Sequence, residues 1–289
     1  MKRLVTNGIN IIASQPVSVY GFNYQSAESA AFTCYPTPLL GTRYCLMARP
    51  SYVGHHSEFA IVATADDTTV NITPSATANL AGSLWTNSIT LQQGQTYAIN
   101  SIGQSDENDV TGTLVSSDKP LAVFAGANLA LMPYTNTTAG NPLVQEQLPV
   151  DSWGTQALSM GFAGRTNGDS YRVLAAYDGT VILTNGWMAG TNQAGKFIDL
   201  IIDGPVQFQA NQPIQVAHFA NGGDFDHPET HFGDPCMILL PPAGHYLQTN
   251  IVCTPTYDPG FDENFLNIIV AQSGTNSTFL DVTNAITSF

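Results

Sequence analysis

The chain carries few charged side chains. Only 10% of its 289 residues are Asp, Glu, Lys or Arg, with 8 Lys or Arg against 22 Asp or Glu. The formal net charge of −14 would repel a phosphate backbone, which argues against nucleic acid and anionic lipid as partners. A surface poor in charge and rich in Thr, Ser, Asn, Gln and Gly is typical of a secreted or cell-surface β protein.

Long apolar runs and helical periodicity are also lacking. No run of apolar residues approaches the length that a membrane-spanning helix needs, so the sequence predicts no such helix. Met1-Lys2-Arg3 resembles the start of a signal peptide, but no apolar stretch follows it. Apolar and polar residues instead alternate, as in residues 69–73 and 88–91, which predicts β-strands.

The motifs of common enzyme classes are missing. There is no Gly-x-Ser-x-Gly elbow, Gly-rich phosphate loop or nucleotide fingerprint. His218 lies in an apolar strand pattern, which favours a buried, hydrogen-bonded histidine over a catalytic base. The sequence therefore predicts a protein that is not an enzyme and needs no cofactor.

Three landmarks recur in the same order about every hundred residues, which indicates an internal repeat. The first is a Pro-led apolar strand, the second a Gly-centred turn, and the third an Asp/Gly hairpin. They are found at Pro16, Pro120 and Pro213, then at Gly41, Gly154 and Gly244, and then at residues 66–67, 178–179 and 273–274. We predict an all-β fold of repeated antiparallel β units of about 100 residues, either propeller-like or a tandem β-sandwich.

These landmarks divide the chain into four parts. Residues 1–55 form the second half of a first unit, 56–163 a second unit, 164–255 a third, and 256–289 the first half of a further unit. Two explanations remain open for the half units. Either the sequence is a fragment of a longer chain, or the two halves complete each other and close a ring.

Four cysteines form two local pairs, Cys34 with Cys45 and Cys236 with Cys253, each across a Pro/Gly turn. Two disulfides would imply an oxidising compartment. The alternative is four buried free thiols, because an even count does not establish pairing.

The densest polar cluster runs from residue 224 to residue 234. Asp224, Asp226, Glu229 and Asp234 could gather oxygens around a calcium ion, and His227 with His231 could hold zinc. A solvated acidic loop is the simpler interpretation. Loops at 132–141 and 221–234 are also candidate binding loops. Their candidate contact residues are Tyr134, Asn136, Phe225, His227 and His231.

Several stretches resemble the IgGFc-binding protein N-terminal domain family, a module of secreted mucus proteins and of bacterial surface proteins. The resemblance covers nearly the whole chain, and its clearest stretches are Gln15-Pro16-Val17-Ser18-Val19-Tyr20, Asp67-Thr68-Thr69-Val70-Asn71-Ile72, Glu146-Gln147-Leu148-Pro149, Asn167-Gly168-Asp169-Ser170-Tyr171-Arg172 and Asp234-Pro235-Cys236-Met237. The family usually carries more sequence at both ends, which favours the fragment explanation. This chain has Met132, Pro133 and Tyr134 where the family often has a cysteine pair, so that loop's role does not transfer.

The resemblance implies an extracellular, non-catalytic interaction or structural module. We expect rigid β units to present rim loops to a protein or glycan partner, or to copies of the chain itself in a surface layer or filament. The alternatives are a calcium-dependent glycan-binding module and a glycan hydrolase that uses the acidic loops.

Overall fold

The computed structural model describes residues 2–25, 28–52, 54–80, 87–102, 108–133, 137, 139–226, 233–249, 252 and 264–271. The chain divides into two compact units, Met1–Tyr246 and Leu247–Phe289. All the described strands and helices belong to the first unit.

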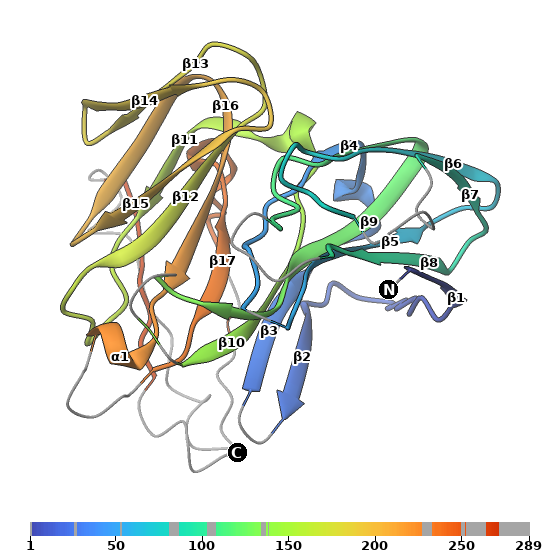
Figure 1. Ribbon diagram of the computed structural model, residues 1–289, viewed down its shortest axis with the longest axis horizontal. Coiled ribbons are helices and arrows are strands. Elements are labelled where there is room, and N and C mark those ends of the chain that lie inside the picture. The colour runs from blue at the N-terminus through green and yellow to red at the C-terminus, as the bar shows by residue number, and fades with distance from the viewer. Residues whose placement is uncertain are drawn as a thin grey trace. The chain divides into compact units, whose positions relative to one another are not determined.

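The first sheet has eight antiparallel strands in the order β1-β8-β5-β9-β6-β7, with β4 and β10 also paired to β9 (Figure 1). Burial alternates along its strands because side chains on a strand point to opposite faces in turn. In β5, for example, Phe59, Ile61 and Ala63 are buried while Glu58 is exposed. The strands are β1 (Lys2–Thr6), β4 (Gly41–Cys45), β5 (Ser57–Ala63), β6 (Thr68–Thr73), β7 (Ser88–Leu91), β8 (Gln95–Asn100), β9 (Leu114–Leu131) and β10 (Gly140–Glu146).

The second sheet has seven strands and repeats this arrangement without a counterpart of β1. Its order is β14-β13-β16-β12-β15, with β11 and β17 also paired to β16. Its strands are β11 (Gly154–Ser159), β12 (Asp169–Ala175), β13 (Thr180–Thr184), β14 (Trp187–Asn192), β15 (Phe197–Ile202), β16 (Val206–Ala220) and β17 (Cys236–Leu240), with the short helix α1 (Gly223–Asp226) between the last two.

A proline divides the long central strand of each sheet. Before Pro120, β9 pairs with β6, and after it with β5. Before Pro213, β16 pairs with β13, and after it with β12. Proline has no N–H to donate to a ladder, so it suits the point at which the strand changes partners. This explains the Pro-led strands of the sequence.

A third copy of part of the unit is the two-stranded sheet of β2 (Val19–Gln25) and β3 (Glu28–Cys34). β2 pairs with β3 as β9 pairs with β10 and as β16 pairs with β17. A single 3₁₀ turn follows β3, β10 and β17: η1 (Thr37–Leu39), η3 (Val150–Ser152) and η4 (Ala243–His245). The predicted all-β fold of repeated antiparallel units is therefore confirmed.

The repeated glycines mark close approaches between these turns and strands. A Cβ on Gly41 would lie 2.5 Å from Pro149 Cβ, and a Cβ on Gly154 would lie 2.6 Å from Pro242 Cβ. Gly41 and Gly154 begin β4 and β11. Gly244, the third glycine of the predicted series, instead lies inside η4 with no atom within 4 Å of such a Cβ.

Two segments differ from the sequence interpretation. β4 precedes residue 56 yet pairs with β9, so strand pairing crosses the predicted boundary there. Residues 264–270, whose pattern predicts a strand, are described outside any strand and are mostly exposed.

Buried apolar residues form three clusters. One lies within the first sheet, around Ile61, Tyr97 and Val123, and one within the second, around Tyr171, Phe208 and Val216. The remaining cluster lies between the two sheets. It includes Met47 and Trp153, which precede the second sheet in the chain, and Phe219 and Leu239, which belong to the second sheet.

The turn at Gly112 brings the two sheets within backbone contact. Gly112 has φ +83°, and a Cβ on it would lie 2.1 Å from the carbonyl oxygen of Gly195. We expect Gly112→Ala to lower the free energy of unfolding by about 2 kcal/mol, because it adds left-handed strain and a backbone clash.

Urea denaturation measures this loss. Gly179→Ala is the matched control, since Gly179 has φ +69° but nothing within 4 Å of the added Cβ. Equal losses in both variants would show that the contact between Gly112 and Gly195 is unimportant.

Candidate functional site

The acidic segment after β16 is held by an ion pair. Asp226 is buried, and its Oδ2 lies 2.6 Å from Nη1 of Arg165. The same nitrogen donates to the carbonyl of Asn221 at 3.0 Å. Within the described part of the chain, no group of three His, Cys, Asp or Glu side chains could hold a metal ion. Asp226 is thus engaged by an arginine. Calcium binding by Asp224, Asp226, Glu229 and Asp234 stays a prediction.

The other residues of the candidate loops are only partly described. Glu229, His227, His231, Tyr134 and Asn136 lie outside the described residues. Phe225 lies in α1, where its carbonyl accepts a hydrogen bond from Nδ2 of Asn167 at 2.6 Å. This bond ties α1 to the turn that precedes β12.

Cys34 and Cys45 are free thiols in this structure, so the predicted disulfide between them is not shown and stays a prediction. Cys34 lies opposite Val19 in the two-stranded sheet, whereas Cys45 lies opposite Leu114 in the first sheet. Burial raises the pKa of the Cys45 thiol to about 12, so it stays protonated and unreactive. Cys236 is likewise a free thiol, and Cys253 lies outside the described residues.

Ser159, His218 and Asp169 form a hydrogen-bonded row inside the second sheet. His218 Nε2 lies 2.8 Å from Asp169 Oδ2, and His218 Nδ1 lies 3.1 Å from Ser159 Oγ. The imidazole stacks between Phe162 and Tyr171, and all three members of the row are buried. The row resembles a triad in composition, and neither of the two cavities described below is lined by it. Its hydrogen bonds support the prediction of a structural His218.

An ion cluster that is buried except for Asp199 joins the two sheets, and the sequence analysis missed it. This junction cluster consists of Arg49, Asp109, Arg172 and Asp199. Arg172 Nη1 lies 2.5 Å from Asp109 Oδ2, and Arg172 Nε lies 2.7 Å from Asp199 Oδ1. Arg49 Nη1 lies 2.8 Å from Asp199 Oδ2. The first sheet's side supplies Arg49 and Asp109, and the second sheet supplies the other two.

Electrostatics keep Arg172 charged in this site. Burial by itself lowers the pKa of Arg172, but Asp109 and Asp199 raise it above the usual arginine value. Burial and the neighbouring Arg172 lower the pKa of Arg49 to about 10. The guanidinium of Arg172 also lies over the ring of Phe197, 3.6 Å from its centroid. The cluster therefore fixes how the face of β12 packs against the preceding repeat.

The equivalent face of the first sheet is hollow. Strand pairing places Ala60 and Ala98 where the second sheet has Arg172 and Asp199. A cavity of about 430 Å³ lies there, lined also by Glu58, Asn100 and Phe124. Asn100 is only 6% exposed, and its Oδ1 has no hydrogen-bond partner. A buried polar atom of this kind usually has a partner in the functional state.

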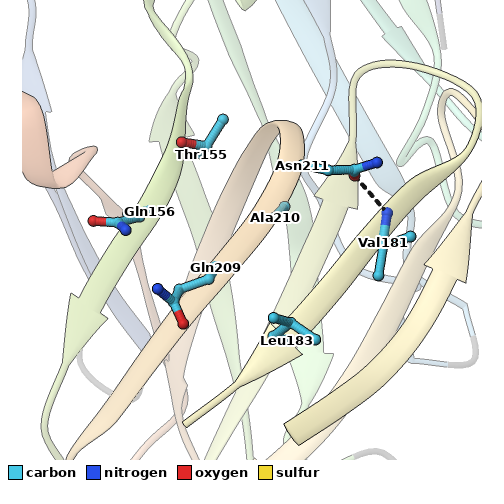
Figure 2. Close-up of a pocket in the computed structure, with 7 residues that line it drawn as sticks. All are labelled: Thr155, Gln156, Val181, Leu183, Gln209, Ala210 and Asn211. Carbon is cyan, nitrogen blue, oxygen red and sulfur yellow. Dashed lines mark hydrogen bonds between the residues drawn. The ribbon is translucent and has the colours of Figure 1, made fainter. Parts of the chain in front are cut away.

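A second, smaller cavity of about 290 Å³ is lined by residues of the second sheet. Figure 2 shows Gln156 on β11, Leu183 on β13 and Gln209 on β16 around it. Asn211 Oδ1 accepts a hydrogen bond from the backbone N–H of Val181 at 2.7 Å. No aromatic or charged side chain lines this cavity, so it lacks the stacking surface common in sugar sites.

Comparison with known proteins decides the family. The family model described as IgGFc binding protein matches residues 30–289. The chain belongs to the IgGFc-binding protein family. A human relative named IgGFc-binding protein is 25% identical over 256 residues, which cover 86% of this chain but 5% of that protein. No solved structure matches the chain.

Family membership confirms the resemblance that the sequence indicated. The matched region covers only 5% of the length of the human relative. Among its described residues, no helix is long and apolar enough to cross a membrane.

Proposed function

We propose that this member of the IgGFc-binding protein family is an extracellular, non-catalytic adhesion module that binds other protein chains by strand addition. The receiving strand is β2, and the partners include copies of the chain itself. The family's name and the human relative's name support a protein-binding role. The repeated sheets supply the rigid support that such a role needs.

The exposed apolar residues that lead into β2 carry this proposal, together with the repeated pairing pattern. β9 has β10 on one edge and β5 on the other, and β16 has β17 on one edge and β12 on the other. β2 pairs with β3, and the described strands include no counterpart of β5 or β12 beside it. A strand added in that position would bind through main-chain hydrogen bonds.

The residues that lead into β2 support the same surface. Ile9, Ile12 and Val17 are 89%, 87% and 62% exposed. The residue equivalent to Val17 is Leu121 in the first sheet and Ile214 in the second, and both are buried. Exposed apolar residues in a strand pattern mark a surface that becomes buried in an assembly.

The proposal predicts concentration-dependent association of the 289-residue protein. Sedimentation velocity should show species larger than the monomer as concentration rises. Val17→Lys should remove them without lowering the melting temperature, because an exposed charge at a strand edge blocks addition.

Ile201→Lys is the matched control, since Ile201 is 52% exposed on β15, an edge strand of the second sheet. It should associate like the wild type. A wild type that stays monomeric at every concentration would contradict self-association, and an effect of Ile201→Lys alone would move the surface to β15.

A further inference from the structure

We propose that the cavity in the hollow face of the first sheet binds the guanidinium group of an arginine side chain of a protein partner. The inference goes beyond the proposed function, because it assigns a different surface and the chemistry of the group that binds there. It does not depend on strand addition at β2, so either proposal can fail while the other stands.

Strand register places the groups that line this cavity on one face of the sheet. Glu58 on β5 lies opposite Asn100 on β8. Ala60, two residues further along β5, lies opposite Ala98 on β8 and Phe124 on β9. Directly opposed residues share a face, and so do residues two apart on a strand. A carboxylate, an amide and an aromatic ring therefore line the cavity together with two alanine methyl groups.

Two buried polar atoms of the cavity wall lack hydrogen-bond partners among the described residues. They are Asn100 Oδ1 and His56 Nδ1. The backbone of His56 is fixed by Asn128, whose Oδ1 accepts from the His56 N–H at 2.6 Å and whose N–H donates to the His56 carbonyl at 3.0 Å. An amide oxygen only accepts hydrogen bonds, and so does an imidazole nitrogen without a proton. Buried acceptors of this kind are costly to leave unpaired, which points to a bound donor.

The charge of the cavity favours a donor that is a cation. Glu58 adds a carboxylate to the two acceptors, and no Lys or Arg is found among the described residues that line the cavity. The formal net charge of −14 also attracts cations from a distance. A guanidinium carries five N–H donors and a permanent positive charge, so it matches several acceptors at once.

The second sheet shows which group occupies the equivalent face. There the guanidinium of Arg172 lies over the ring of Phe197, 3.6 Å from its centroid, and donates to Asp199 at 2.7 Å. Strand pairing puts Ala60 in the position of Arg172. The first sheet thus has a carboxylate, an amide oxygen and an aromatic ring on this face, but alanine in place of the arginine. A guanidinium from a partner would supply the missing group, because it binds carboxylates and stacks on aromatic rings.

The cavity also has a suitable size and an exposed side. Its volume of about 430 Å³ falls within the range of small-ligand pockets, roughly 300–1,000 Å³. Glu58 is exposed whereas Asn100 is buried, so a cation would meet the carboxylate first and the amide oxygen deeper in the cavity. The methylene groups of an arginine side chain would lie against the methyl groups of Ala60 and Ala98.

NMR of alanine methyl groups in the 289-residue protein tests the site with N-acetylarginine amide as the probe. This probe presents its side chain as a peptide does. The methyl signals of Ala60 and Ala98 should shift and saturate as the probe is added. N-acetylcitrulline amide has nearly the same shape without the charge, and it should bind about tenfold more weakly, because hydrogen bonds from a charged donor are the stronger ones.

Two variants and a matched control locate the contact. Ala60→Arg supplies a guanidinium from within the chain, as Arg172 does in the second sheet, and should weaken probe binding about tenfold or more by filling the cavity. Glu58→Gln should weaken it by a similar factor, because it removes the carboxylate charge. Asp178→Asn removes the same charge from an exposed turn of the second sheet and keeps the acceptor for the Ala194 N–H. It should bind the probe like the wild type.

Several results would overturn the inference. These are equal affinity for the arginine and citrulline probes, wild-type affinity in both cavity variants, or shifts that spare Ala60 and Ala98. Equal weakening by Asp178→Asn would also overturn it, because net charge alone would then attract the probe. Tighter binding of free arginine than of the capped probe would assign the site to an amino acid and overturn the protein partner. Circular dichroism confirms that each variant is folded, and sedimentation measures association through β2 separately.

Discussion

Replacing Arg172 with methionine is expected to lower the free energy of unfolding by about 3–5 kcal/mol, the usual cost of breaking a buried ion pair from one side. Arg172 is 2% exposed and contacts Asp109 and Asp199 at 2.5 and 2.7 Å. The variant leaves Asp109 buried without its cation. Chemical denaturation monitored by circular dichroism measures the change.

The control for this variant is Arg43→Met. Arg43 lies 3.7 Å from Asp151 in a pair whose side chains are 54% and 67% exposed, so its loss should cost less than about 1 kcal/mol. A similar small cost for Arg172→Met would mean that the junction cluster does not hold the two sheets together.

Replacing Glu146 with glutamine is expected to remove a pH-dependent loss of stability. Glu146 is 2% exposed, and burial raises its pKa to about 7, although the hydrogen bond from the Tyr35 N–H opposes the rise. The folded state therefore holds a proton that the unfolded carboxyl, with a pKa of about 4.3, releases. Stability contributed by the protonated form is present at low pH and is lost as pH rises from about 4.3 to about 7.

The size of this loss is about 4 kcal/mol in the wild type. Glu146→Gln should be more stable than the wild type at pH 8 by a similar amount and should show little change over that range. Glutamine keeps the acceptor for the Tyr35 N–H, which lies 2.6 Å from Oε2 of Glu146. Parallel pH profiles for the two proteins would show that Glu146 is ionised in the folded state throughout.

Much of the fold can be predicted from the sequence, because local patterns determine it. Alternation in residues 69–73 and 88–91 matches β6 and β7, and Pro120 and Pro213 mark where β9 and β16 change partners. Gly244 was wrongly matched to Gly41 and Gly154, because glycine is common near turns. The residue type alone does not show whether it lies in the turn, as Gly244 does, or begins the next strand. The pairing of β4 with β9 depends on contacts between residues far apart in sequence, which composition does not reveal.

The candidate site was harder to predict, because burial and long-range pairing determine its chemistry. Asp226 resembles a calcium ligand in its sequence context, yet Arg165, which lies before β12, engages it. Cys34 and Cys45 are close in sequence, but β3 and β4 carry them into different sheets. A signal for the junction cluster was present in Arg172, a cation within an otherwise buried strand, where an unpaired charge is too costly to keep.

Hydrogen–deuterium exchange at two protein concentrations tests the central claim most directly: the chain consists of copies of one β unit, and the exposed apolar residues that lead into β2 become buried when chains associate. At low concentration, amides around Val17 should exchange rapidly while β9 and β16 stay protected. At high concentration, the amides around Val17 should gain protection. Rapid exchange around Val17 at every concentration, or protection there in the monomer, would contradict the account.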